Sequence, residues 1–491
     1  MTVSGAARRF ALISFLSWLP TGLFIPVLVL LLLDKGVSLT AVAALGVAYS
    51  VAIMVLELPT GGLADVVGRR PMIVASAAAS LVALLLLGLA ESILLLVASS
   101  ILRGVGRALG SGPIEAWFVD TVQARSEVSE AELSRGLSFG LMASSVALAV
   151  GTVAGALIPF ALHTSLAVPV LIAAGCDAVR LVVTLFAMPE PKYAPTSLRC
   201  VLRGVPAAIA TGLRLGVRNA LLIRILMTGA GMVAALAVIE LLSPAWMGEL
   251  AGSPDRGVLA YGLVAAVGFA ADASGSGLSM RLARRLASVR AICLVGFSVS
   301  VFSLACLAGA TAVSGLGGIF AAGGAYLLMF VGLGMVEGPM GQLLHSQVAA
   351  AERATVLSIQ SLIGYVGGAV GAVAVGQLAV VTSMAVAFGA SAVLLAVPGW
   401  LLVTSATPTR LLASPTTGVL PAVVVDDLVE WLPGSGFEGL AGVEGGRDQH
   451  RLADVVGQAE ECGDLVLEPE MQGGPGRAES TGSRGQHVTP R

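Results

Sequence analysis

The chain has 491 residues, of which 56% are hydrophobic and only 12% are charged, and its mean hydropathy is +0.92. Soluble globular domains carry about 25% charged residues, so this composition excludes an ordinary cytosolic enzyme and indicates an integral membrane protein. Residues 421–491 hold 13 acidic and 5 basic residues, whereas residues 1–420 hold 17 and 23, a division that argues against nucleic acid as a partner.

Twelve stretches of the chain are long and apolar enough to cross a membrane as helices. A hydrocarbon core of about 30 Å needs about 20 mostly apolar residues. The stretch that begins at Phe10 is too long for the apolar region of a signal peptide, so it is taken as the first span. The twelve spans lie near residues 10–33, 38–59, 72–90, 92–113, 135–160, 166–188, 219–242, 257–280, 289–311, 315–343, 354–380 and 382–403.

Polar stretches divide the chain around these spans. We predict an N-terminal six-helix half within residues 1–188, a basic cytoplasmic loop at 189–218 and a C-terminal six-helix half within 219–404. Residues 405–491 are acidic and rich in Gly, Pro and Ser, which predicts a disordered cytoplasmic tail.

Basic residues predict the orientation of the chain in the membrane. If the N-terminus lies inside, 17 Lys and Arg residues near the span ends fall on the cytoplasmic side and only 2, Lys35 and Arg256, fall outside. This asymmetry follows the positive-inside rule and supports an even number of spans. We therefore expect a multi-pass protein of the plasma membrane with both termini in the cytoplasm.

The two halves of the chain repeat each other. Residues 57–70, which end the second span, align without gaps on residues 272–285, which end the eighth, at an offset of 215. The alignment pairs Glu57 with Asp272 and an Arg-Arg pair with another Arg-Arg pair. Repeated halves are common in transporters, so we predict an all-α membrane protein with twelve transmembrane helices in two parallel six-helix halves.

The loop after the second span carries a recognisable motif. Residues 61–70 read GGLADVVGRR, which resembles the loop 2–3 signature of the major facilitator superfamily, G-x-L-x-D-x-x-G-R-R/K. With twelve spans, a basic central loop and a weaker copy of the motif after the eighth span, the resemblance covers residues 10–403. It implies the major facilitator fold and small-molecule transport, with an overall similarity to twelve-helix drug:proton antiporters.

The resemblance also implies a conformational latch at this motif. Asp65 would face the N-terminus of the eleventh helix, where the helix dipole favours a carboxylate. Arg69 or Arg70 would pair with Asp120 at the cytoplasmic end of the fourth helix, holding the halves together until the transporter opens inward. The alternative is that the two arginines only follow the positive-inside rule. The residues of the predicted latch are Gly61, Asp65, Gly68, Arg69, Arg70 and Asp120.

Two other signatures of the family are incomplete here. The helix-4 signature has Arg where this chain has Ser100, and Arg103 and Arg107 follow instead. The antiporter signature of helix 5 contains a Gly-Pro pair, whereas residues 151–159 keep only small residues at every fourth position, a pattern typical of a helix-packing face. Proton-coupled efflux is therefore predicted from overall similarity to drug exporters. It is not predicted from the helix-5 signature, which would indicate the direction of transport.

Acidic residues inside the spans are candidates for proton coupling. A charged residue at membrane depth costs about 2.5–3.5 kcal/mol to insert, so it is kept for a function. Glu57, Glu115, Asp272 and Glu337 have no opposite charge three or four residues away on their helices. We favour Glu337, because Arg107 shares a predicted helix face with Glu115 whereas no Arg lies on the helix of Glu337. The alternative is that these acids are only hydrogen-bonded groups near helix ends.

Other polar residues within the spans receive simpler interpretations. Arg103, Arg107 and Trp117 are candidates for the wall of the substrate cavity, with Trp117 placed to stack on a flat cation. The alternative for Trp117 is a position at the membrane interface. Glu240 lies near the predicted end of its span, where its carboxylate would extend to the interface.

Neither a catalytic site nor a metal site is indicated by the sequence. The five cysteines show no paired spacing, and there is no phosphate-binding loop of the G-x-x-x-x-G-K-S/T type. We expect no enzyme activity, cofactor or metal, and a monomer that binds a small-molecule substrate, protons and the lipid bilayer. A proton-coupled uptake symporter and a non-transporting membrane scaffold of the same fold are the alternatives.

Overall fold

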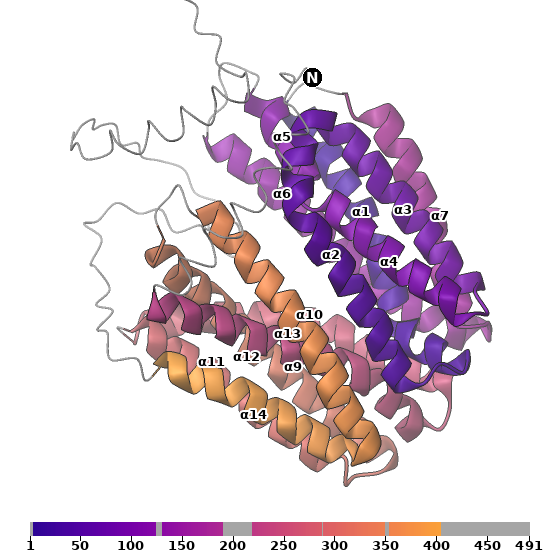
Figure 1. Ribbon diagram of the computed structural model, residues 1–491, viewed down its shortest axis with the longest axis vertical. Helices are drawn as coiled ribbons and strands as arrows, with labels where there is room; N and C mark the ends of the chain where they lie inside the picture. Colours follow the sequence, from indigo (N-terminus) through magenta and orange to yellow (C-terminus); the bar gives the residue numbers. More distant parts are fainter. Residues whose placement is uncertain (1–2, 124–129, 190–218, 287, 349–352, 404–491) are drawn as a thin grey trace, which may run out of the picture. The chain divides into compact units, whose positions relative to one another are not determined.

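The computed structural model describes residues 3–123, 130–189, 219–286, 288–348 and 353–403, and all regular secondary structure in these ranges is helical. Figure 1 follows the helices from indigo at α1 to orange at α14. They are α1 (Val3–Asp34), α2 (Leu39–Val67), α3 (Arg69–Leu89), α4 (Ile93–Gly110), α5 (Pro113–Gln123), α6 (Glu130–Leu162), α7 (Ala167–Ala187), α9 (Ala220–Ala251), α10 (Pro254–Ala283), α11 (Val289–Ala310), α12 (Gly315–Ser346), α13 (Arg353–Val381) and α14 (Met384–Val403).

Twelve helical stretches in the described ranges have the length and hydropathy of membrane spans, with α4 and α5 forming one stretch. The predicted all-α fold with twelve spans is therefore confirmed. We call α1–α7 the N-terminal half and α9–α14 the C-terminal half. The predicted central loop, apart from its first residue, and the whole of the predicted tail lie outside the described residues.

The fourth span contains a break that the sequence analysis missed. Helix α4 ends at Gly110, Gly112 has a φ of 90°, and α5 begins at Pro113. Glycine tolerates this positive φ, and proline is favoured in the first turn of a helix because its missing N–H needs no partner there. Arg107 and Glu115 consequently belong to different helices, so the prediction that they share one helix face is wrong.

Helix α9 continues well beyond the predicted end of the seventh span. The predicted span stops at residue 242, before Pro244, but the helix runs to Ala251. Side chains after the proline, including Trp246 and Met247, are buried, so packing stabilises the extension. Glu240 therefore lies eleven residues from the end of its helix and not at the interface.

Serine residues begin several helices after short turns. At the starts of α2, α4, α10 and α11, a serine side chain accepts a hydrogen bond from a backbone N–H of the first turn, which satisfies a donor that the helix leaves unpaired; these residues are Ser38, Ser92, Ser253 and Ser288. Gly68 has a φ of 102° between α2 and α3, a conformation that favours glycine. This glycine makes the tight turn between the two helices.

The two ends of the helix bundle can be told apart by their turns. One end carries the turn between α1 and α2, and we call it the Lys35 end; the other carries the turn between α2 and α3, and we call it the Gly68 end. At the Lys35 end, Lys35 Nζ donates hydrogen bonds to the carbonyl oxygens of Gly88 (3.0 Å) and Ala90 (2.7 Å) at the end of α3. Burial lowers the pKa of Lys35, and the nearby Glu91 and Asp34 partly oppose this effect.

The halves contact each other at the Lys35 end. Thr40 on α2 hydrogen-bonds through Oγ1 to Gln377 Oε1 on α13 at 2.9 Å. A Cβ atom on Gly248 of α9 would lie 2.9 Å from Leu30 Cδ2 of α1. Gly262 on α10 packs against Ala156 of α6. These contacts join α1, α2 and α6 to α9, α10 and α13.

Small residues allow α1 and α6 to approach closely. A Cβ atom on Gly151 would lie 2.7 Å from the Leu19 carbonyl oxygen, and one on Gly155 would overlap the Leu23 carbonyl oxygen. The prediction that residues 151–159 form a helix-packing face is therefore confirmed.

We expect Gly155→Ala to reduce the yield of folded protein strongly, because its methyl group would meet backbone that cannot rotate away. Thermal unfolding of the purified protein in detergent, followed by tryptophan fluorescence, measures the effect. Gly175→Ala is the matched control, since a Cβ atom at Gly175 on α7 meets nothing within 4 Å. An unchanged melting temperature for Gly155→Ala would contradict this packing.

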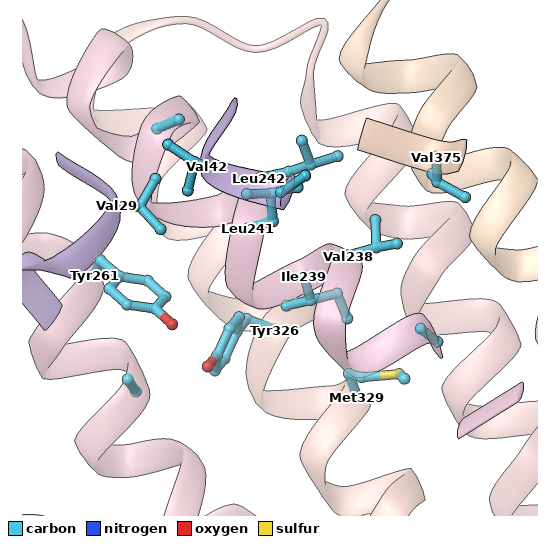
Figure 2. Close-up of a cluster of buried hydrophobic side chains, with 14 of the residues drawn as sticks. Val29, Val42, Val238, Ile239, Leu241, Leu242, Tyr261, Tyr326, Met329 and Val375 are labelled. Atoms are coloured by element: carbon cyan, nitrogen blue, oxygen red, sulfur yellow. The ribbon is translucent and has the colours of Figure 1, made fainter. Parts of the chain in front are cut away.

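The largest buried core of the described residues extends over both halves. Figure 2 shows part of it, including Val238 and Ile239 of α9, Tyr261 of α10 and Tyr326 of α12. The Tyr261 and Tyr326 rings are nearly perpendicular, with centroids 6.0 Å apart, an edge-to-face arrangement that aromatic pairs prefer. This core lies next to the polar residues considered below.

Candidate functional site

Several polar and aromatic residues lie at one depth in the bundle. Phe24, Tyr49 and Arg103 each lie ten residues from the Lys35 end of their helices, and Glu240 and Tyr326 lie eleven residues from it. With a rise of 1.5 Å per residue, this is a depth of about 15–17 Å. A hydrocarbon core is about 30 Å thick, so these residues lie near its middle.

Arg103 on α4 lies between two aromatic rings. Its guanidinium carbon is 4.6 Å from the centre of the Phe24 ring and 5.2 Å from that of the Tyr49 ring. Among the described residues no carboxylate forms an ion pair with it, although it lies deep inside the protein and is partly accessible to water. Cation–π contacts stabilise the guanidinium but leave its N–H groups available to a ligand.

Arg107 lies one helical turn further along α4. Its guanidinium carbon is 4.9 Å from the centre of the Trp18 ring of α1, and it interacts electrostatically with Tyr365 of α13. Arg107 therefore interacts with both halves. The positions of Arg103 and Arg107 are compatible with the predicted substrate cavity.

Glu57 on α2 also reaches the opposite half. Ser361 of α13 donates a hydrogen bond from Oγ to Glu57 Oε1 at 2.8 Å. The other carboxyl oxygen, Oε2, is buried without a hydrogen-bond partner. An unpaired carboxylate oxygen is costly to bury when it is charged.

Asp272 on α10 and Glu337 on α12 lie close enough to interact electrostatically. The two helices cross tightly here, because a Cβ atom on Gly334 would overlap the Asp272 carbonyl oxygen. Glu337 is exposed whereas Asp272 is half-buried. Glu337 is therefore less buried than Asp272, and its predicted role in coupling stays a prediction.

Glu115 and Trp117 on α5 do not lie as expected. Glu115 is exposed near the start of α5. Trp117 is completely buried beside Phe10 and Phe118, and its Nε1 donates a hydrogen bond to the Pro189 carbonyl oxygen at 2.9 Å. The Trp117 ring is thus a core residue of the N-terminal half, and its predicted place in a cavity wall is corrected.

Trp117→Ala should destabilise the protein by about 3–5 kcal/mol, as large truncations in a packed core do. We expect a lower thermal midpoint in detergent, while the substrate specificity of the remaining folded protein is unchanged. Trp400→Ala is a suitable comparison, because Trp400 on α14 is 64% exposed. Altered specificity without loss of stability would instead assign Trp117 to the substrate site.

The residues of the predicted latch are only partly described. Arg69 Nε at the start of α3 lies 3.4 Å from Asp120 Oδ2 on α5, and Arg70 donates a hydrogen bond to the Leu185 carbonyl oxygen on α7. Both contacts stay within the N-terminal half, so neither by itself holds the two halves together.

The remaining part of the latch depends on Asp65. Gly61 and Asp65 lie in α2, but the side chain of Asp65 and those at the start of α13, around Arg353, lie outside the described residues. The predicted contact of Asp65 with the eleventh span therefore stays a prediction.

Glu240 is a candidate that the sequence analysis missed. It lies deep in the protein, yet its side chain is exposed. It interacts electrostatically with Tyr261 and Tyr326. The sequence signal was present in the apolar residues after Pro244, which extend the helix and move Glu240 away from its end.

Comparison with known families identifies the protein class. The sequence matches the Major Facilitator Superfamily over residues 10–372. The chain belongs to the major facilitator superfamily. It is therefore a multi-pass membrane protein of a secondary transporter family, which points to transport and not to enzyme catalysis.

Solved transporters share the fold of this superfamily member at low sequence identity. The nucleoside transporter NupG aligns with a TM-score of 0.66 and 11% identity, covering 82% of this chain and 98% of that chain. A POT family transporter in complex with 5-aminolevulinic acid aligns with a TM-score of 0.65 and 12% identity, covering 82% of this chain and 100% of that chain. No curated protein matches the sequence.

Proposed function

We propose that this superfamily member exports a small molecule across the plasma membrane in exchange for protons, by alternating access. The distribution of Lys and Arg supports an orientation with both termini and the Gly68 end in the cytoplasm. In this orientation, the contacts between the halves at the Lys35 end close the outer side.

The proposal rests mainly on the contacts of the Glu57 carboxyl group. It hydrogen-bonds to Ser361 across the two halves, while its second oxygen is buried without a partner. Protonation would remove the charge from the buried carboxyl group, and separation of the halves would break its bond to Ser361. Glu57 therefore combines a proton site with a contact that must change during alternating access.

Asp272 and Glu337 form a second acidic site, which we propose assists coupling within the C-terminal half. The Arg69–Asp120 pair, with Asp65 and the turn at Gly68, is proposed to brace the N-terminal half as it moves. Monomeric function is proposed as well, since each chain supplies both halves of the transport pathway.

Everted membrane vesicles test direction and coupling together. The vesicles are acidified inside, and a pH-sensitive dye reports proton release when a panel of organic cations, anions and zwitterions is added outside. Export by antiport predicts substrate-dependent proton release and substrate accumulation, which vesicles without the protein lack. Accumulation only in intact cells would support uptake by symport, and no movement in either system would favour a non-transporting role.

A further inference from the structure

Two unpaired charges of opposite sign face the interior of the bundle at the same depth. Arg103 comes from the N-terminal half and Glu240 from the C-terminal half, ten and eleven residues from the Lys35 end of their helices. Both lie deep in the protein and remain accessible to water. No ion pair within the described residues neutralises either of them, which is an expensive arrangement at membrane depth.

The surroundings of Arg103 suit a ligand with an apolar body. Phe24 and Tyr49 flank Arg103, and both rings are only partly buried. On the other half, Glu240 interacts electrostatically with Tyr326, whose ring is buried in the core. Aromatic surface is therefore available to a ligand beside the guanidinium.

Arg103 and Glu240 do not neutralise each other. They belong to helices of different halves, and no ion pair is formed between them. The N–H groups of Arg103 suit a carboxylate or another oxyanion, and the Glu240 carboxylate suits an ammonium group. A ligand that carries both groups would compensate both buried charges at once.

We propose that the transported substrate is zwitterionic, with its anionic group bound by Arg103 and its cationic group bound by Glu240. This inference rests on the proposed transport function and specifies its substrate class. A purely cationic substrate would leave Arg103 uncompensated, and a purely anionic one would leave Glu240 uncompensated. The apolar body of the substrate would lie against Phe24 and Tyr49, which flank the guanidinium.

Equilibrium binding to the purified full chain in lipid nanodiscs tests the substrate class. The probes are 4-(aminomethyl)benzoate, the cation 4-methylbenzylamine and the anion 4-methylbenzoate, with homologues in which one to four methylene groups lengthen the aminoalkyl arm. All three share one aromatic body and differ only in charge. We expect at least one zwitterion to bind roughly tenfold tighter than its cationic and anionic counterparts, since each charge-assisted hydrogen bond adds affinity.

Two variants test separately which side chain binds which charged group of the substrate. Glu240→Gln should lower the affinity of the zwitterion to that of the matched anion, and Arg103→Gln should lower it to that of the matched cation. Either variant suffices if the other fails to fold. Glu249→Gln is the control, because Glu249 lies on the same helix but is exposed near its end, and it should bind like the unmodified chain.

The outcomes separate this inference from the transport proposal, because binding needs no proton gradient. Equal affinity for zwitterion and cation, retention of the zwitterion's advantage in both variants, or binding of no probe would overturn the zwitterion assignment. Preferential binding of the zwitterion without proton-driven transport would leave the assignment intact and refute only the proposed coupling.

Discussion

Glu57→Gln is expected to abolish proton-driven accumulation in everted vesicles while it preserves exchange of substrate without a gradient. Glutamine keeps the size of the side chain and a carbonyl oxygen for the hydrogen bond from Ser361, but it cannot gain or lose the coupled proton. Uphill transport therefore fails although the halves can still alternate. The measurement compares substrate accumulation under an imposed pH gradient with counterflow at equal pH.

Two variants serve as controls for Glu57→Gln. Ser361→Ala removes the hydrogen-bond partner but keeps the carboxyl group, so coupling should persist at a changed rate. Glu115→Gln should transport normally, because Glu115 is exposed on α5. If Glu57→Gln still accumulates substrate uphill, Glu57 does not carry the proton, and Asp272 becomes the next candidate.

The spans could be predicted from sequence because membrane crossing is a local property. A run of about 20 apolar residues is enough to identify each one, and the twelve predicted segments correspond to the twelve helical stretches of the structure. Helix ends were less predictable. Pro244 suggested an end to the seventh span, yet the packing of Trp246 and Met247 extends α9 to Ala251.

The environment of each candidate residue could not be predicted in the same way. Whether a side chain faces core, cavity or lipid depends on how helices from distant parts of the chain pack together. Trp117 and Glu115 are two residues apart, yet one is fully buried and the other exposed. The contact of Glu57 with Ser361 joins residues 304 positions apart, and no local pattern indicates it.

Asp272→Asn is expected to impair proton-driven transport more than Glu337→Gln. Both carboxyl groups lie at the crossing of α10 and α12, but Asp272 is half-buried and Glu337 exposed, so Asp272 is the more enclosed of the two sites. Because the two groups interact, their substitutions should not be additive. The double variant should therefore be no slower than Asp272→Asn alone.

Initial rates in everted vesicles, measured side by side at matched protein levels, provide the comparison. A complete loss of uphill transport in Glu337→Gln alone would restore Glu337 as the main proton site, and strictly additive losses would show that the two acids act independently.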